Sequence, residues 1–124
     1  MAREEKKILV IDDSSVNNLL LQNILEEENY KVIVAFSGRE GLKLTESEKP
    51  DLILLDIMMP RMDGIEVLKR IKSSDKTVDI PVIMLTAKLD SADRKSSLEI
   101  GAIDYINKPV IIDELVTKVK NILQ

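Results

Sequence analysis

The chain has 124 residues, a length typical of one domain, and its content of 44% hydrophobic and 32% charged residues is ordinary for a globular protein. The formal net charge of −4 argues against a nucleic-acid partner, and no apolar run approaches the roughly 20 residues of a membrane span, so we expect a cytoplasmic protein that binds no membrane. Because the sequence has no Cys and no His, disulfides, thiol chemistry and imidazole metal ligands are excluded, and a metal site must use oxygen ligands.

Five short runs rich in Ile, Val and Leu alternate along the chain with stretches that have the periodicity of amphipathic helices. The predicted strands are residues 7–11, 31–36, 51–55, 81–85 and 104–107. The predicted helices are residues 15–28, 39–48, 64–72, 90–100 and 113–123. The first, third and fourth strands are almost entirely apolar, as are parallel strands that helices cover on both faces. This alternation predicts an α/β fold with a doubly wound, five-stranded parallel sheet flanked by five helices, and we expect residues 1–124 to form a single domain.

Chemically capable side chains follow four of the predicted strands. Asp12 and Asp13 follow the first strand, Asp56 the third, Thr86 the fourth and Lys108 the fifth. Because ligands of open α/β sheets bind at the carboxyl ends of the strands, we expect these side chains to meet at one rim. Three carboxylates there would repel one another unless a hard cation such as Mg²⁺ relieved the repulsion. A carboxylate can also accept a phosphoryl group, whose oxygens an ammonium and a hydroxyl would then bind.

Each of these residues also has an ordinary structural explanation when it is taken alone. Asp12 and Asp13 could cap the first helix, Asp56 could be an exposed carboxylate at a strand end, and Thr86 is a good strand former. Lys108 before a proline could be a solvated loop residue. The combination of all five residues in this order is what favours a phosphoryl site over these explanations.

Four stretches of sequence carry a resemblance to a known family: ILVIDDS, DLILLDIMMPRMDG, PVIMLTA and GAIDYINKP. Thr86 lies 30 residues after Asp56, and Lys108 lies 22 residues after Thr86. With these motifs the chain resembles, over essentially its full length, the receiver domain of bacterial two-component response regulators, the family of the chemotaxis regulator CheY. The resemblance implies the flavodoxin-like strand order 2-1-3-4-5. It implies a phosphorylation-activated switch of a two-component system or phosphorelay rather than an enzyme.

The resemblance also implies how the acidic residues act. Asp56 would be the phosphoacceptor, in a reaction that requires Mg²⁺. Asp12, Asp13, Asp56 and the backbone carbonyl of Met58 would form the Mg²⁺ site. The side chains of Met58 and Lys88 would control water access to the phosphoryl group, and their chemistry implies slow self-hydrolysis.

Further residues gain expected roles from the same resemblance. Thr86 and Lys108 would contact the phosphoryl group, Tyr105 would be the aromatic residue of the switch together with Thr86, and the peptide bond before Pro109 would be cis. Family members that dimerise through the fourth helix, fifth strand and fifth helix usually carry an Arg where this chain has Asp113. Asp104 would lack that partner, and we expect a monomer in the unphosphorylated state.

Because the chain has no His, the phosphoryl donor must be a phosphohistidine on a partner, either a sensor histidine kinase or a histidine phosphotransfer protein. The first predicted helix begins beside the acidic residues. At about 100° per residue, a core-facing arc of this helix holds Leu20, Leu21, Ile24 and Leu25. Val16 and Leu19 lie outside this arc, and with Leu20 at the edge they form a candidate docking patch for the partner. Scattered exposed apolar residues are the alternative explanation.

Other classes of protein remain as alternatives. A flavodoxin-like flavin-binding protein shares the fold, but its phosphate-binding loop would not begin with Asp-Asp, and few aromatic residues are present to stack on a flavin. A phosphatase with an Asp nucleophile would be expected to carry an Asp-x-Asp motif at Asp12 or Asp56. A degenerate receiver that acts only as a docking module usually lacks part of the acidic set or the lysine, and this chain has both.

Overall fold

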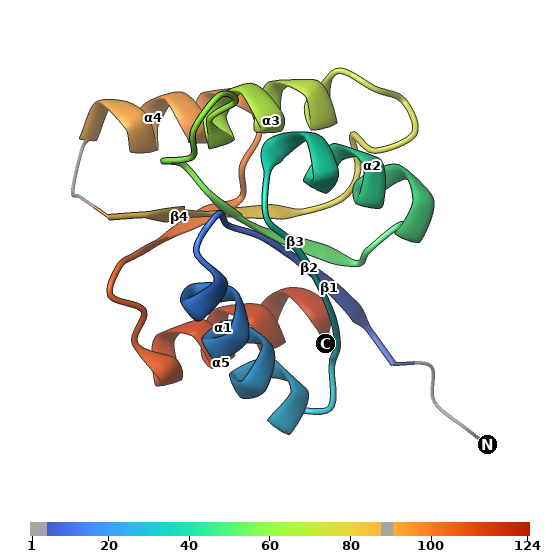
Figure 1. Ribbon diagram of the computed structural model, residues 1–124, viewed down its shortest axis with the longest axis vertical. Helices are drawn as coiled ribbons and strands as arrows, with labels where there is room; N and C mark the ends of the chain where they lie inside the picture. Colours follow the sequence, from blue (N-terminus) through green and yellow to red (C-terminus); the bar gives the residue numbers. More distant parts are fainter. Residues whose placement is uncertain (1–4, 88–90) are drawn as a thin grey trace.

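The computed structural model describes residues 5–87 and 91–124, which form one parallel five-stranded sheet and five helices. The strands are β1 (Lys7–Ile11), β2 (Lys31–Ala35), β3 (Leu52–Asp56), β4 (Val82–Thr86) and β5 (Asp104–Asn107). The helices are α1 (Ser15–Glu27), α2 (Gly38–Glu48), α3 (Gly64–Lys72), α4 (Ser91–Ile100) and α5 (Ile112–Leu123). The strand order β2-β1-β3-β4-β5 confirms the predicted topology (Figure 1). Residue 90, where the fourth helix was predicted to begin, lies outside the described residues.

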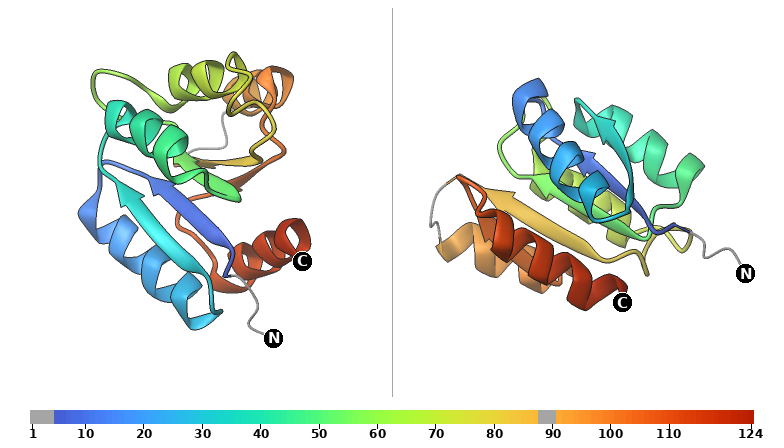
Figure 2. Two further views of the ribbon diagram at one scale, coloured as in Figure 1. Left: turned by 90° about the vertical axis from the view of Figure 1, so that its right-hand side faces the viewer. Right: turned by 90° about the horizontal axis from the view of Figure 1, so that it is seen from below.

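The helices cover both faces of the sheet, as the apolar strands predict. Helices α1 and α5 pack on one face, and α2, α3 and α4 pack on the other (Figures 1 and 2). The central strands β3 and β4 are buried along their whole length, and in β1 every residue after Lys7 is buried. Each buried Leu or Ile contributes about 1.5–3 kcal/mol relative to an exposed one. The centre of the sheet is therefore stable and can hold residues at the carboxyl ends of its strands in fixed positions.

Two predicted boundaries differ from the structure in a way that matters for function. The third and fourth strands include Asp56 and Thr86 as their last residues, whereas the prediction placed both residues just after the strands. In the parallel ladder Asp56 is opposite Leu85, and Thr86 is opposite Asn107. Strand pairing therefore fixes the backbone of both residues directly. The peptide bond between Lys108 and Pro109 is cis, as predicted.

Helix α1 corrects one detail of the sequence prediction. Ser14 is its N-cap and accepts a hydrogen bond from the Asn17 N–H, so the helix begins immediately after the acidic pair. Its buried residues are Asn18, Leu21, Ile24 and Leu25. Leu20, predicted to be part of the core-facing arc, is 46% exposed. Asn18 instead belongs to the buried face.

The loop 57–63 folds back over the end of β3 because Gly64 opens the next helix. The Gly64 N–H donates to the Ile57 carbonyl at 2.8 Å. A Cβ atom at position 64 would overlap the carbonyl oxygen of Asp56 and the Cα atom of Ile57. Only glycine permits this close approach, which holds Met58 beside the carboxyl end of β3.

None of the helices formed by residues 5–87 and 91–124 has both the length and the apolar character that crossing a membrane requires.

Candidate functional site

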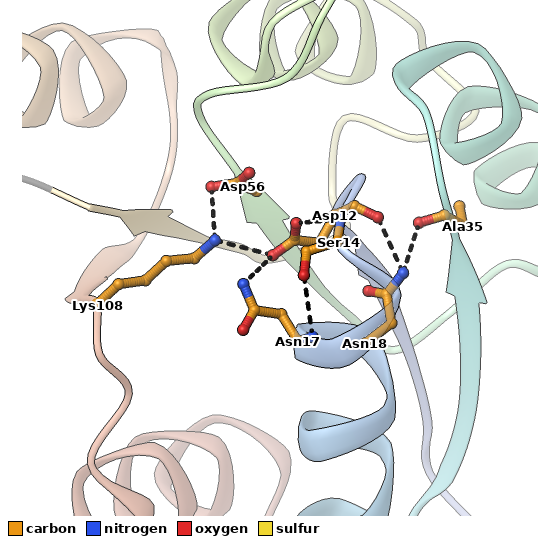
Figure 3. A network of polar contacts seen from close by, with 7 residues as sticks. All are labelled: Asp12, Ser14, Asn17, Asn18, Ala35, Asp56 and Lys108. Atoms are coloured by element: carbon orange, nitrogen blue, oxygen red, sulfur yellow. Dashed lines mark hydrogen bonds and ion pairs between the residues drawn. The ribbon is translucent and has the colours of Figure 1, made fainter.

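The carboxyl ends of the strands bring the predicted acidic residues together. Carboxylate oxygens of Asp12, Asp13 and Asp56 lie within 4.8 Å of one another. Lys108 reaches this cluster from the end of β5, with its Nζ atom 2.9 Å from Asp12 Oδ2 and 3.0 Å from Asp56 Oδ1 (Figure 3). Asp12 and Asp56 are buried, whereas Asp13 is exposed. The fold therefore places one ammonium between two buried carboxylates and leaves a third carboxylate at the surface.

The two aspartates of the β1–α1 turn have different surroundings. Asp12 Oδ1 accepts a hydrogen bond from the Ser14 N–H at 2.9 Å. Asp12 Oδ2 accepts hydrogen bonds from Lys108 and, at 3.4 Å, from the side-chain amide of Asn17. The Asp13 carboxylate has no hydrogen bond or ion pair with any residue in the ranges 5–87 and 91–124. Asp13 therefore offers oxygen atoms to a ligand more readily than Asp12 does.

Burial and like charges set the electrostatics of the site. Burial, together with the negative charge of Asp12 and more weakly of Asp13, raises the pKa of Asp56, although Lys108 opposes the change. For Lys108, burial by itself would lower the pKa, but the hydrogen bonds and charges of Asp12 and Asp56 outweigh it and raise the pKa. Lys108 is therefore held as a cation, and an ionised Asp56 is held in surroundings that disfavour its charge.

Thr86 and Tyr105 lie on the neighbouring strands β4 and β5, in different surroundings. Thr86 is buried at the end of β4, and its carbonyl accepts the Lys108 backbone N–H at 2.7 Å. Tyr105 is half-buried on β5. Its hydroxyl accepts a hydrogen bond from Arg94 Nη1 at 3.1 Å, and the guanidinium lies 4.7 Å from the ring centre. An Arg of α4 therefore clamps the tyrosine by both its ring and its hydroxyl.

The remaining predicted residues are exposed or lie outside the described ranges. Met58 is 68% exposed on the loop after β3. Val16 and Leu19 are 73% and 58% exposed on α1, and Leu20 lies beside them. Lys88 lies outside the described residues.

Sequence reasoning missed the two asparagines of α1. Asn17 contacts the Asp12 carboxylate, and Asn18 donates to the Asp12 and Ala35 carbonyls at 2.9 and 3.3 Å (Figure 3). The one sequence signal was an Asn at a position of apolar helical spacing, where Asn is a poor helix former.

The donor set fits a hard divalent cation. It consists of carboxylate oxygens from three residues, close enough to share one ion, with the exposed Asp13 leaving room for water. No nitrogen or sulfur ligand that would favour a softer metal is present among these groups. Asp12, Asp13 and Asp56 therefore form an acidic cluster that suits a hard cation such as Mg²⁺.

Comparisons with known proteins agree on one family. Residues 8–120 match the family model described as the response regulator receiver domain. The alkaline phosphatase synthesis transcriptional regulatory protein PhoP of Bacillus subtilis is 48% identical over 119 residues, which cover 96% of this chain and 49% of PhoP. The chain spans about half the length of the curated relatives it matches.

Solved structures give the same result. A putative response regulator from Chloroflexus aurantiacus superimposes with a TM-score of 0.91 at 35% identity, covering 97% of this chain and 98% of that one. The chemotaxis protein CheY4 of Vibrio cholerae also gives a TM-score of 0.91, at 26% identity, covering 96% and 99% of the two chains.

The raised pKa of Asp56 predicts an unusual effect of Asp56→Asn on stability in metal-free buffer. Between the ordinary carboxyl pKa of 3.8 and the raised value, the native state binds more protons than the unfolded state, so stability falls as pH rises through this window. Above the window, the native state holds an ionised Asp56 that the variant lacks. We therefore expect Asp56→Asn to have the larger free energy of unfolding near neutral pH, with the difference shrinking as pH falls towards 3.8.

Urea unfolding followed by circular dichroism in EDTA, at several pH values, measures this difference. Asp75→Asn, a change at an exposed loop aspartate, is the control and should follow the parent. A less stable Asp56→Asn at neutral pH would contradict the electrostatic account of the site.

Proposed function

The chain belongs to the response regulator receiver family, and from that premise we propose that Asp56 accepts a phosphoryl group from a phosphohistidine partner, with Mg²⁺ bound at the acidic cluster. Its function as a family member is phosphorylation-activated signalling in two-component systems. The comparisons support neither the flavin-binding alternative nor the docking-only one. We further propose that the 124 residues form a single receiver domain, because both hydrophobic clusters of the chain are built on the same sheet.

One observation carries the assignment of Asp56. Its carboxylate is buried at the end of a central strand, next to the Lys108 ammonium and two other aspartates. An Asp56 oxygen would attack the phosphorus atom and form an O–P bond. The N–P bond to the donor would break with its electron pair left on the imidazole. Lys108 would neutralise charge on the phosphoryl oxygens, and the Thr86 hydroxyl would donate a hydrogen bond to one of them.

Asp13, Asp56 and the Met58 carbonyl would hold the Mg²⁺ directly, and Asp12 would support them. This division follows from the hydrogen bonds, because Asp12 already accepts from Ser14, Asn17 and Lys108. The bound ion would supply positive charge opposite the transferring phosphoryl oxygens.

We class the chain as a switch rather than an enzyme, because the phosphoryl group ends on the protein's own side chain. The cytoplasmic location and the monomeric unphosphorylated state stay predictions.

The contacts of Tyr105 support a role in the switch. Arg94 holds the ring on one side, and Lys118 lies 6.0 Å from the ring centre while it pairs with Asp104 at 2.8 Å. The phosphoryl group would draw the Thr86 hydroxyl towards it, and Tyr105 would leave Arg94 for the space that Thr86 vacates. The surface formed by α4, β5 and α5 would then change its shape and charge.

The docking patch of Val16, Leu19 and Leu20 is supported by its position. The patch lies on the helix that begins beside Asp13, and a cavity of about 120 Å³ separates Leu20 from the loop after Lys108. That loop continues into Ile111 and Ile112, whose side chains are also exposed. The apolar face of a histidine-bearing helical partner would cover these residues while its phosphohistidine meets Asp56.

The first test of this function is labelling. We expect incubation with acetyl phosphate and Mg²⁺ to add one phosphoryl group to the parent chain, measured by intact mass, and none to Asp56→Asn. Asp13→Ala should lower the labelling rate by about tenfold or more at limiting Mg²⁺, since loss of a supporting group alone weakens metal sites by 10–100-fold. Asp75→Asn should label as the parent does. An adduct on Asp56→Asn, or a rate unchanged by EDTA, would refute the assignment.

The second test concerns the switch. We expect Thr86→Ala to be labelled but to lose most of the change in NMR chemical shifts of β5 and α5 that phosphorylation causes in the parent. Thr86→Ser keeps the hydroxyl and should retain that change, because the new charge-assisted hydrogen bond is worth about 1.5–3 kcal/mol. Equal shift changes in Thr86→Ala and the parent would exclude coupling through this hydroxyl.

The third test separates docking from chemistry. The double variant Val16→Ser, Leu19→Ser should be labelled normally by acetyl phosphate, because neither residue belongs to the core or to the acidic cluster. Phosphoryl transfer from the partner protein to this variant should slow by about tenfold or more, since each apolar anchor that is buried in an interface contributes more than about 1 kcal/mol to binding. The donor is whichever phosphorylated kinase or phosphotransfer protein labels the parent fastest.

The matched control for docking is the double variant Leu98→Ser, Ile103→Ser, which removes two exposed apolar side chains, one from α4 and one from the residue before β5. It should accept the phosphoryl group from the partner at the parental rate. If the two double variants behave alike, the patch on α1 is not the docking site.

A further inference from the structure

Asn18 is a polar side chain in an apolar position. It lies on the buried face of α1 with Leu21, Ile24 and Leu25, and only 1% of it is exposed. Its Oδ1 atom is buried and accepts no hydrogen bond from the residues that the structure describes. A leucine would continue the apolar face without burying an unpaired acceptor, so helix packing does not explain the asparagine.

The hydrogen bonds of its side-chain nitrogen explain why an asparagine occupies position 18. Nδ2 donates to the Asp12 carbonyl at 2.9 Å and to the Ala35 carbonyl at 3.3 Å, one hydrogen for each acceptor (Figure 3). The Ala35 carbonyl also accepts the Asp12 N–H at 3.1 Å. One side chain therefore ties α1 to the ends of both β1 and β2, at the residue where the chain leaves the sheet.

The carbonyl that Asn18 holds belongs to the peptide group that joins Asp12 to Asp13. Because a peptide group is planar, fixing the direction of its oxygen also fixes the N and Cα atoms of Asp13. The Asp13 side chain itself has no partner within the described residues, so its direction depends on this backbone. We propose that Asn18 is a positioning residue that aims the Asp13 carboxylate at the acidic cluster and so sets the affinity of the chain for Mg²⁺. This inference depends on the metal role proposed above.

The test measures Mg²⁺ binding without phosphorylation. Amide NMR shifts of residues 13 and 56 in the unphosphorylated chain, titrated with MgCl₂, give the half-saturating concentration. Asn18→Leu removes both donors while filling the buried space, and we expect half-saturation to rise by about tenfold, as for other groups that orient metal ligands. Asn18→Ala adds no volume and should show the same rise if the leucine variant does not fold.

Two further variants keep the outcomes distinct. Thr77→Val removes another buried hydrogen bond, the one that the Thr77 hydroxyl donates to the Ile71 carbonyl at 2.7 Å. Thr77 lies in the segment that leads into β4, so it is at the amino end of that strand, whereas the acidic cluster is at the carboxyl ends. This variant should bind Mg²⁺ as the parent does, and a loss as large as that of Asn18→Leu would show that lowered stability alone weakens binding and overturn the inference. Asp13→Ala should abolish the binding.

If the parent and Asp13→Ala behave as expected but Asn18→Leu and Asn18→Ala bind Mg²⁺ like the parent, Asn18 is only structural and the inference is overturned while the proposed function stands. If the parent itself fails to bind Mg²⁺, the proposed metal role falls and this inference falls with it.

Discussion

The site depends on the electrostatic balance between the Lys108 ammonium and the aspartates at the carboxyl ends of the central strands. Parallel strands necessarily bring their carboxyl ends to one edge, and here the chain places a carboxylate at the end of two adjacent strands. Burial of Asp12 and Asp56 strengthens their mutual repulsion because little water screens it. Lys108 contacts both, at 2.9 and 3.0 Å, and offsets part of that repulsion. The balance is incomplete, as the raised pKa of Asp56 indicates, and a divalent cation would complete it.

The rest of the fold keeps these charges in place. Side chains on the central strands are fully buried, so the backbone positions of Asp56 and Thr86 are set by strand pairing and by packing on both faces of the sheet. The loops that follow the strands are held by local contacts. Gly64 closes the loop after β3, and Ser14 and Asn18 hold the turn after β1. A rigid sheet with individually fixed loops is the arrangement that precise placement of charge requires.

The surface formed by α4, β5 and α5 has charged contacts of its own. Asp104 was expected to lack the Arg partner that dimerising relatives usually carry, and in this structure it pairs with Lys118 of the same chain. Arg94 and Lys118 both approach Tyr105, so the tyrosine lies among cations from α4 and α5. Movement of Tyr105 would therefore change its contacts with both Arg94 and Lys118, and the proposed switch would reach the surface formed by α4, β5 and α5 in this way.

The sequence by itself determined the strand and helix alternation, the parallel sheet and the meeting of Asp12, Asp13, Asp56 and Lys108. All of these follow from local periodicity and from the rule that parallel strands end at one edge. The family motifs then fixed the strand order and the cis bond before Pro109.

Only the tertiary structure decided which atoms pair. Lys108 bonds to Asp12 across 96 positions of sequence, and Arg94 binds Tyr105 from a different element. Asn18 rather than Leu20 lies on the buried face of α1, and this likewise depends on how that helix is rotated against the sheet. Helical periodicity defines an apolar arc only to within about one residue, whereas a hydrogen bond depends on tenths of an ångström, and those are set by packing between elements far apart in the sequence.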